Sequence, residues 1–153
     1  MSSDEQIVSE RITIEAPARV VFAIVADPHQ HSRIDGSGSV RGVSVGPERL
    51  SQGARFGARM RLFGLPYRIT NRVVEFEGDR RIAWRHFGGH RWRYELEPLS
   101  DSQTQVRESF DYSRHSRLSA RLITTLGFPA RNRRGIQQTL INLKAAAERD
   151  AGA

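Results

Sequence analysis

Two titratable side chains lie on predicted strand faces that are otherwise apolar. By the alternation of a strand, His86 shares a face with Trp84, and Glu108 shares one with Val106 and Phe110. A carboxylate beside a histidine in an apolar pocket can act as an acid/base pair, because burial and neighbouring charge tune the proton affinity of such groups. His86 and Glu108 are therefore the candidate catalytic residues. The alternative interpretation is an ordinary hydrogen-bonded polar pair near the end of a sheet.

The clearest local pattern is a β-hairpin over residues 80–98, RRIAWRHFGGHRWRYELEP, with a Gly-Gly pair at its turn. Alternation places Trp84, Trp92 and Tyr94 on one face and arginines and glutamates on the other. An interior of large aromatic rings with polar tips favours a lined cavity over a plain aliphatic core. The same alternation predicts a three-residue loop or a G1 bulge at the glycines, with Trp84 opposite Tyr94.

Inner-facing residues of other strands and of the C-terminal helix extend this predicted binding surface. The predicted ligand-binding residues are Phe56, Met60, Tyr67, Trp84, His86, Trp92, Tyr94, Glu108, Phe110 and Leu126. The phenols of Tyr67, Tyr94 and Tyr112 could orient a carbonyl or hydroxyl group of a ligand. A filled core is the alternative for the apolar members, because that is the usual meaning of an apolar strand face.

The elements that must position these residues follow from the periodicity of the chain. A strand over 7–15 precedes a helix that starts at Ala16-Pro17 and ends at Asp27-Pro28, and a short helical turn follows within 29–35. Further strands are predicted at 40–45, 55–62, 67–76 and 105–112, in addition to the two strands of the hairpin. Leu118, Leu122 and Leu126 then begin a helical stripe that Ile136 and Leu140 continue beyond a bend or break at 127–129. This order indicates a single α+β domain over residues 1–153.

The composition narrows the classes of function. The chain has no cysteine, which excludes disulfides and thiol chemistry, and no apolar run is long enough to span a membrane, so we expect no membrane insertion. The polar, acidic start MSSDEQIVSE is unlike a secretory signal, so we expect a cytoplasmic protein. The net charge of +7 is carried almost wholly by arginine, because Lys144 is the only lysine. These arginines are spread along the chain without an aromatic stacking platform, which disfavours nucleic acid as the partner.

No metal or cofactor is predicted. His29 and His31, with Asp27 and Asp35 nearby, offer donors in one segment, but their spacing matches no known metal site, and a solvated surface loop is the preferred interpretation. The oligomeric state is left open, and a homodimer is compatible with the sequence.

Three segments carry a resemblance to a known family: ITIEAPARVVFAIVADPHQHSRI, RRIAWRHFGGHRWRYELEP and VRESFDYS. Together they resemble the START-like, or SRPBCC, superfamily, and in particular its polyketide cyclase/dehydrase and lipid-transport-like members. The resemblance implies a helix-grip fold, in which a curved antiparallel sheet of about seven strands wraps around a long C-terminal helix above a hydrophobic pocket. Many members carry a tryptophan near the segment from His31 to Ile34, and this chain has none there, which we expect to reshape that end of the pocket.

Three hypotheses of function follow. The leading one is binding of a small hydrophobic or amphipathic molecule, lipid-like or polyketide-like, in a cavity between the sheet and the C-terminal helix. The second is an enzyme of the polyketide cyclase or dehydratase type, with His86 or Glu108 as general base. The third is a basic module that binds nucleic acid or another anionic surface. Whether any reaction is catalysed stays open, because a fold does not determine a function.

Overall fold

Seven strands form one antiparallel sheet in the order β1-β7-β6-β5-β4-β3-β2. The computed structural model describes residues 6–85, 90–113, 118, 121–122, 125 and 127–152. Its elements are β1 (Ile7–Ile14), α1 (Ala18–Val25), the 3-10 helix η2 (Pro28–Gln30), α2 (His31–Ile34), β2 (Val40–Val45), β3 (Arg55–Leu62), β4 (Leu65–Glu77), β5 (Arg81–Arg85), β6 (Arg91–Ser100), β7 (Gln103–Asp111) and α4 (Phe128–Gly152). The predicted α+β helix-grip fold is confirmed.

A proline lies near each end of helix α1. Pro17 caps its N-terminus in an extended conformation, where the missing N–H leaves no intrahelical bond unmade. The helix buries Val21, Phe22, Ile24 and Val25. It ends before Asp27-Pro28, and the Asp27 carboxylate then accepts a hydrogen bond of 2.9 Å from the His29 backbone N–H, which caps η2.

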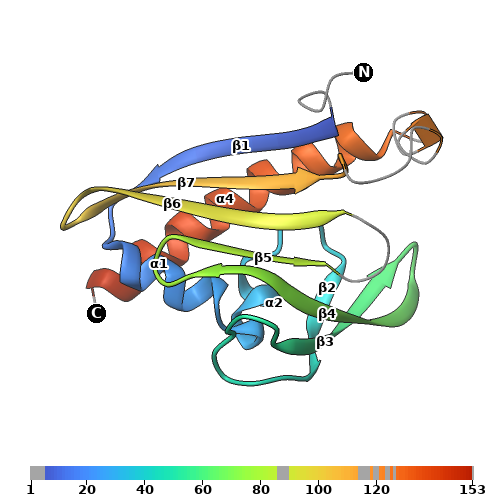
Figure 1. Cartoon of the computed structure of the whole chain (residues 1–153), viewed down its shortest axis with the longest axis horizontal. Helices are drawn as coiled ribbons and strands as arrows, with labels where there is room; N and C mark the ends of the chain where they lie inside the picture. The colour runs from blue at the N-terminus through green and yellow to red at the C-terminus, as the bar shows by residue number, and fades with distance from the viewer. Residues whose placement is uncertain are drawn as a thin grey trace.

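Helix α4 covers the inner face of the sheet. Figure 1 shows it running diagonally behind β6 and β7, and it packs most extensively on β1. Its buried stripe includes Ile136 and Leu140, which the periodicity predicted beyond the break, together with Leu143 and Ala147. Each fully buried leucine or isoleucine contributes roughly 1.5–3 kcal/mol relative to an exposed one, so this stripe anchors the helix on the sheet.

The structure corrects the part of the stripe that precedes the break. Leu118 and Leu122 are 80% and 59% exposed, so the prediction that they continue the core is wrong. Gly127 adopts a positive φ of 75° and α4 starts immediately after it, which confirms a break at this point.

The register of the central hairpin also differs from the prediction. Trp84 lies opposite Trp92, and Tyr94 lies opposite Ile82. The predicted face is correct, because a shift of two residues preserves the side of the sheet, but the predicted pairing of Trp84 with Tyr94 is wrong. The two rings meet diagonally instead, with centroids 5.7 Å apart. The turn at 86–89, and with it the predicted loop type, lies outside the described residues.

The segment after α2 is attached closely to α4. The Gly36 N–H donates a hydrogen bond of 2.8 Å to the Thr139 hydroxyl, and Asn142 donates one of 3.1 Å to the Ile34 carbonyl. A side chain at Gly36 would come within 2.5 Å of the α4 backbone, so only glycine permits this approach. These contacts fix α2 and the residues after it against the helix. Among the described residues, no helix is long and apolar enough to cross a membrane.

Candidate functional site

A row of aromatic side chains crosses the inner face of the sheet. Its members, which we call the aromatic cluster, are Phe56 on β3, Trp84 on β5, Trp92 and Tyr94 on β6, and Phe110 on β7. Phe56 meets Trp84 edge-on at 5.6 Å, and Trp92 lies 4.8 Å from Phe110. Strand alternation places all five side chains on the inner face, and the register sets Trp92 opposite both Trp84 and Phe110. Phe56 lies opposite Asn71 and reaches Trp84 across β4.

Glu108 is the one acidic residue that projects into this cluster among the described residues. It is 4% exposed, and its Oε1 accepts a hydrogen bond of 2.9 Å from the Tyr94 hydroxyl. Its Oε2 is buried and has no hydrogen-bond partner among the described residues. Burial raises the pKa of Glu108 to about 8, although the Tyr94 hydrogen bond acts to lower it. At neutral pH this side chain is therefore mainly a neutral carboxylic acid that can donate a proton.

Tyr94 and Asp35 complete the polar surroundings of Glu108. Burial and the neighbouring Glu108 raise the pKa of Tyr94 well above its ordinary value, so its hydroxyl stays a donor. Asp35 lies after α2, and its negative charge raises the Glu108 pKa further. Its carboxylate is held in place by hydrogen bonds from the Ser37 hydroxyl at 2.7 Å and the Val40 N–H at 3.1 Å. The site thus combines a proton donor with apolar walls.

His31 joins the cluster, contrary to the prediction of a solvated loop. Its ring stacks on Trp84 with centroids 4.8 Å apart, and it meets Phe56 edge-on at 5.4 Å. Its Nε2 lies 2.8 Å from the Val25 carbonyl, which assigns the proton to that nitrogen. Burial lowers the pKa of His31, so the ring is neutral at neutral pH. The sequence carried no local signal for this contact, because it brings α2 against strands that are distant in the chain.

The other predicted site residues lie farther toward the β3–β4 turn or outside the described residues. Met60 and Tyr67 face each other across β3 and β4 on the inner side of the sheet. Met60 is half-buried and Tyr67 is 40% exposed, whereas Phe56 is 2% exposed. The inner face is therefore closed at its centre and more open toward the turn. His86 and Leu126 lie outside the described residues, so their predicted roles stay predictions.

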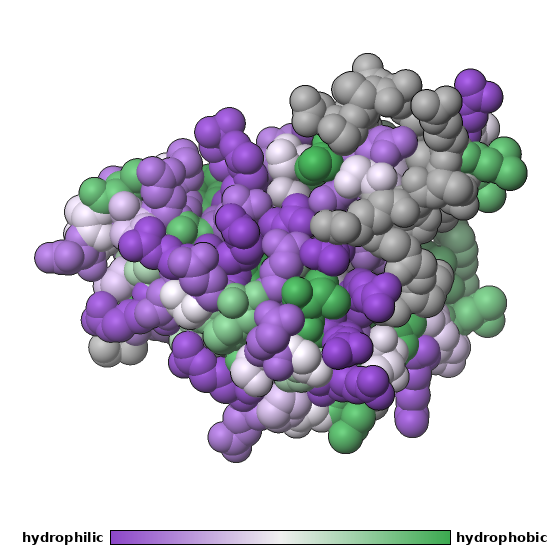
Figure 2. Space-filling view, in the orientation of Figure 1, coloured by the Kyte–Doolittle hydropathy of each residue, from purple (hydrophilic) through white to green (hydrophobic). Residues whose placement is uncertain are grey.

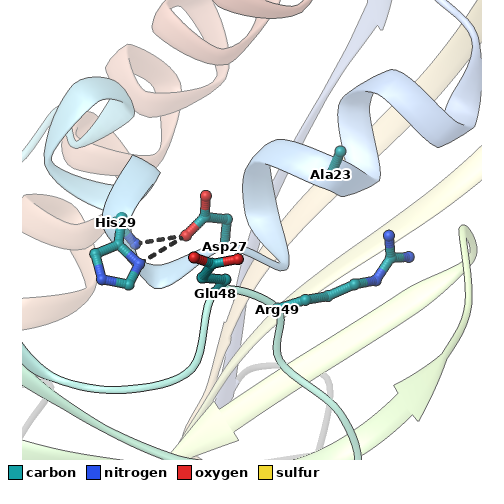
Figure 3. A pocket seen from close by; sticks show the side chains of 5 residues that line it. All are labelled: Ala23, Asp27, His29, Glu48 and Arg49. Carbon is teal, nitrogen blue, oxygen red and sulfur yellow. Dashed lines mark hydrogen bonds and ion pairs between the residues drawn. The ribbon is translucent and has the colours of Figure 1, made fainter.

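A separate pocket of about 480 Å³ lies on the surface beside α1 and η2 (Figure 3). It is lined by Ala23, Asp27, His29, Glu48 and Arg49. His29 Nδ1 lies 3.0 Å from the Asp27 carboxylate, and the histidine side chain is 46% exposed. The pocket shares no residue with the aromatic cluster. Across the part of the chain that the structure describes, no group of three His, Asp or Glu side chains could hold a metal ion.

Comparison with known proteins identifies the family. The family described as polyketide cyclase / dehydrase and lipid transport matches residues 5–148. The uncharacterised protein Rv0088 of Mycobacterium tuberculosis strain H37Rv is 44% identical over 138 residues, which are 89% of this chain and 62% of that protein. The chain therefore spans less than two thirds of the length of this relative.

Solved structures of low sequence identity share the fold. Protein NE0264 from Nitrosomonas europaea superposes with a TM-score of 0.70 at 16% identity, covering 97% of this chain and 98% of that one. The Zhui aromatase/cyclase from Streptomyces sp. R1128 superposes with a TM-score of 0.64 at 18% identity, covering 94% and 93%. With the family pattern matched along nearly its whole length, this chain belongs to the polyketide cyclase/dehydrase and lipid-transport family.

Proposed function

We propose that this protein binds a small, mainly apolar molecule that carries a hydrogen-bond-accepting oxygen. The molecule lies between the inner face of the sheet and helices α2 and α4, against the aromatic cluster. The observation that carries the proposal is Oε2 of Glu108, which is buried and has no hydrogen-bond partner among the described residues. A buried polar atom without a partner costs about 1–3 kcal/mol, so a ligand oxygen that accepts a hydrogen bond from protonated Oε2 stabilises the site.

The surroundings of Glu108 support a ligand of lipid-like or polyketide-like character. Family membership supports a ligand-binding or cyclase-type function. The aromatic cluster offers ring faces and edges to a flat or flexible apolar body, and Tyr94 keeps the carboxyl group oriented. The half-exposed Met60 and Tyr67 provide the approach from the β3–β4 turn. A neutral acid in such walls selects a neutral acceptor, such as a ketone or an ester, over a charged one.

Binding of the fluorescent ketone 6-propionyl-2-dimethylaminonaphthalene tests this proposal. Its emission shifts to shorter wavelength in an apolar site, and its carbonyl supplies the acceptor. We expect Glu108→Leu to weaken binding about tenfold, because the donor is lost, and Trp84→Leu to weaken it by removing a wall. Glu108→Gln should bind nearly as well as the wild type, because the amide also donates a hydrogen bond. Glu97→Gln, on the exposed part of β6, is the matched control.

Two results would contradict the proposed ligand site. Equal affinity in the wild type, Glu108→Leu and Trp84→Leu, with all three folded by circular dichroism, would place the dye elsewhere and end this account of the site. Native mass spectrometry of the purified protein, followed by denaturation, then identifies any natural ligand that copurifies. A stoichiometric apolar molecule without an acceptor oxygen would also contradict the proposed role of Glu108.

The second candidate function is proton transfer in a cyclisation or dehydration. The specific observation in its favour is the raised pKa of Glu108, about 8, because a general acid is most effective when its pKa lies close to neutral pH. In this function the protonated carboxyl group is a general acid toward a ligand carbonyl or hydroxyl oxygen, in place of the general base that the sequence suggested. Turnover of a poly-β-ketone substrate should fall as the pH rises through about 8, and Glu108→Gln should bind but not react. Equal turnover in Glu108→Gln removes this candidate.

A further inference from the structure

The turn between β3 and β4 presents an exposed apolar tip in a strained conformation. Its two central residues, Phe63 and Gly64, have φ values of 50° and 79°, as a two-residue hairpin turn of type I′ requires. Asparagine, aspartate or glycine normally occupies the first of these positions, because a bulky side chain there is unfavourable. Phe63 is nevertheless present and 88% exposed, and Leu65 beside it is 71% exposed. Figure 2 shows hydrophobic atoms projecting along the margin where Figure 1 places this hairpin.

Arginines occupy the outer face of the strands behind this tip. The register places Arg55 opposite Arg72, Arg59 opposite Arg68, and Arg72 in turn opposite Arg85. Like charges directly opposite each other destabilise a sheet, so these pairs are unfavourable in the free protein. We call the set the arginine face, and its members are Arg55, Arg59, Arg61, Arg68, Arg72 and Arg85.

The arginine face is exposed and uncompensated. All six side chains are exposed, and none forms an ion pair with an acidic side chain within the described residues. On the neighbouring part of the same outer face, Arg91 and Arg93 both bind Glu75 at 2.7 Å. The sheet thus neutralises arginine in one region and leaves it free in another. A surface that complements the free region must be extended and negatively charged.

We propose that the tip and the arginine face dock the protein on an anionic phospholipid membrane. Arginines bind lipid phosphates, while exposed phenylalanine and leucine enter the boundary between headgroups and acyl chains. This is a peripheral contact at headgroup depth, distinct from a membrane-spanning segment. Nucleic acid fits less well, because Phe63 and Leu65 lie at the tip and form no stacking row between the arginines.

The start of α4 lies close to the tip, so it would also approach a membrane that the tip contacts. The Arg131 guanidinium, near the start of α4, lies 5.5 Å from the centre of the Phe63 ring. Figure 1 shows the hairpin and this end of α4 at the same end of the molecule. Docking would therefore bring a further arginine toward the lipid headgroups. The docking proposal rests on the outer face and the tip alone and does not depend on the proposed ligand.

Sedimentation with lipid vesicles tests the proposal on the full chain. The probes are vesicles of phosphatidylcholine alone and of phosphatidylcholine mixed with phosphatidylglycerol. We expect the wild type to bind the mixed vesicles and to dissociate as salt is added. The tip variant Phe63→Asn/Leu65→Thr should lose at least tenfold in partitioning while folding normally, because asparagine accepts the positive φ.

A second variant tests the charges. Arg59→Gln/Arg68→Gln removes one facing arginine pair and should lower partitioning into the mixed vesicles by about tenfold or more. The matched controls are Leu99→Asn, which changes an exposed leucine at the end of β6, and Arg107→Gln, which changes an exposed arginine on β7. Both controls should bind vesicles as the wild type does.

Three results would overturn the proposal. The first is a wild type that ignores mixed vesicles at low salt. The second is vesicle binding that the tip and arginine variants leave unchanged. The third is salt-sensitive binding of an oligonucleotide, lost in Arg59→Gln/Arg68→Gln, by a protein that does not sediment with vesicles. That last result would assign the arginine face to nucleic acid.

Discussion

Two glutamates of the same sheet show how position decides the state of a carboxyl group. Glu108 lies on the inner face with one neutral partner, the Tyr94 hydroxyl. Glu75 lies on the outer face, where Arg91 and Arg93 each donate to it at 2.7 Å and Arg93 also reaches Asp111 at 3.2 Å. Glu108 is buried and Glu75 is partly buried, and their pKa values move in opposite directions.

The cause of the difference is the charge of the partners. Burial raises the pKa of Glu75, but the hydrogen bonds from Arg93 and Arg91 outweigh burial and leave it below the ordinary value. Glu108 has no cation to offset burial, and its pKa rises to about 8. An ionised, fully paired Glu75 holds strands together, whereas a neutral Glu108 with a spare oxygen is suited to meet a ligand.

The largest effect that we expect is the contribution of Glu108 to the pH dependence of the free energy of unfolding. Because the folded state holds the Glu108 proton up to about pH 8 and the unfolded state only to about 4.5, the free energy of unfolding should fall as pH rises through this range. The fall contributed by this one group is at most about 1.4 kcal/mol per pH unit. Glu108→Gln should remove it, as measured by urea denaturation at successive pH values. A slope that Glu108→Gln leaves unaltered would contradict the assignment.

Replacing Glu75 by glutamine should have the next largest effect on the free energy of unfolding. Arg91 and Arg93 would lose their charged acceptor in a partly buried setting, so we expect a loss of about 2–3 kcal/mol at neutral pH. The effect has the opposite pH dependence, because the stabilisation by ionised Glu75 is present above about pH 4.5 and is lost as the pH falls through its lowered pKa. Denaturation midpoints at neutral and acidic pH measure the loss of stability and its pH dependence. A loss of stability in Glu75→Gln as small as that in the surface variant Glu97→Gln would contradict the structural role of Glu75.

Removing the Tyr94 hydroxyl should have the smallest effect of the three. Tyr94→Phe deletes the donor to Oε1 of Glu108, so we expect a loss of about 1 kcal/mol. It also removes an interaction that lowers the Glu108 pKa, so that pKa should move above the wild-type value. Denaturation in parallel with a titration of Glu108 checks both results. A lower Glu108 pKa in Tyr94→Phe would show that the hydrogen bond from Tyr94 does not stabilise the ionised form of Glu108.

Much of this fold could be predicted because its strands alternate cleanly. The bounds 40–45 and 55–62 agree with β2 and β3, and the inner face with Phe56, Trp84 and Glu108 follows from parity alone. The pairing of Trp84 was wrong by two residues, because a shift of two preserves every side-chain direction and so leaves no trace in an alternating pattern.

The rest of the site depends on contacts between distant segments. His31 reaches Trp84 because α2 is fixed to α4 through Ile34 and Gly36, and neither contact has a local signature in the sequence. Asp35 influences Glu108 for the same reason. Leu118 and Leu122 were misplaced because a spacing of four shows that two residues share a helix face but does not show which surface that face meets.

The most direct test of the proposed site is the protonation of Glu108 in the folded protein. The carboxyl carbon of each glutamate can be followed by NMR as the pH is raised, with Glu108→Gln identifying the signal. We predict a midpoint near pH 8 for this signal, and the absence of that transition in the variant. A midpoint near the ordinary value of 4.5 would show Glu108 to be ionised at neutral pH, and it would contradict the proposed hydrogen-bond donor.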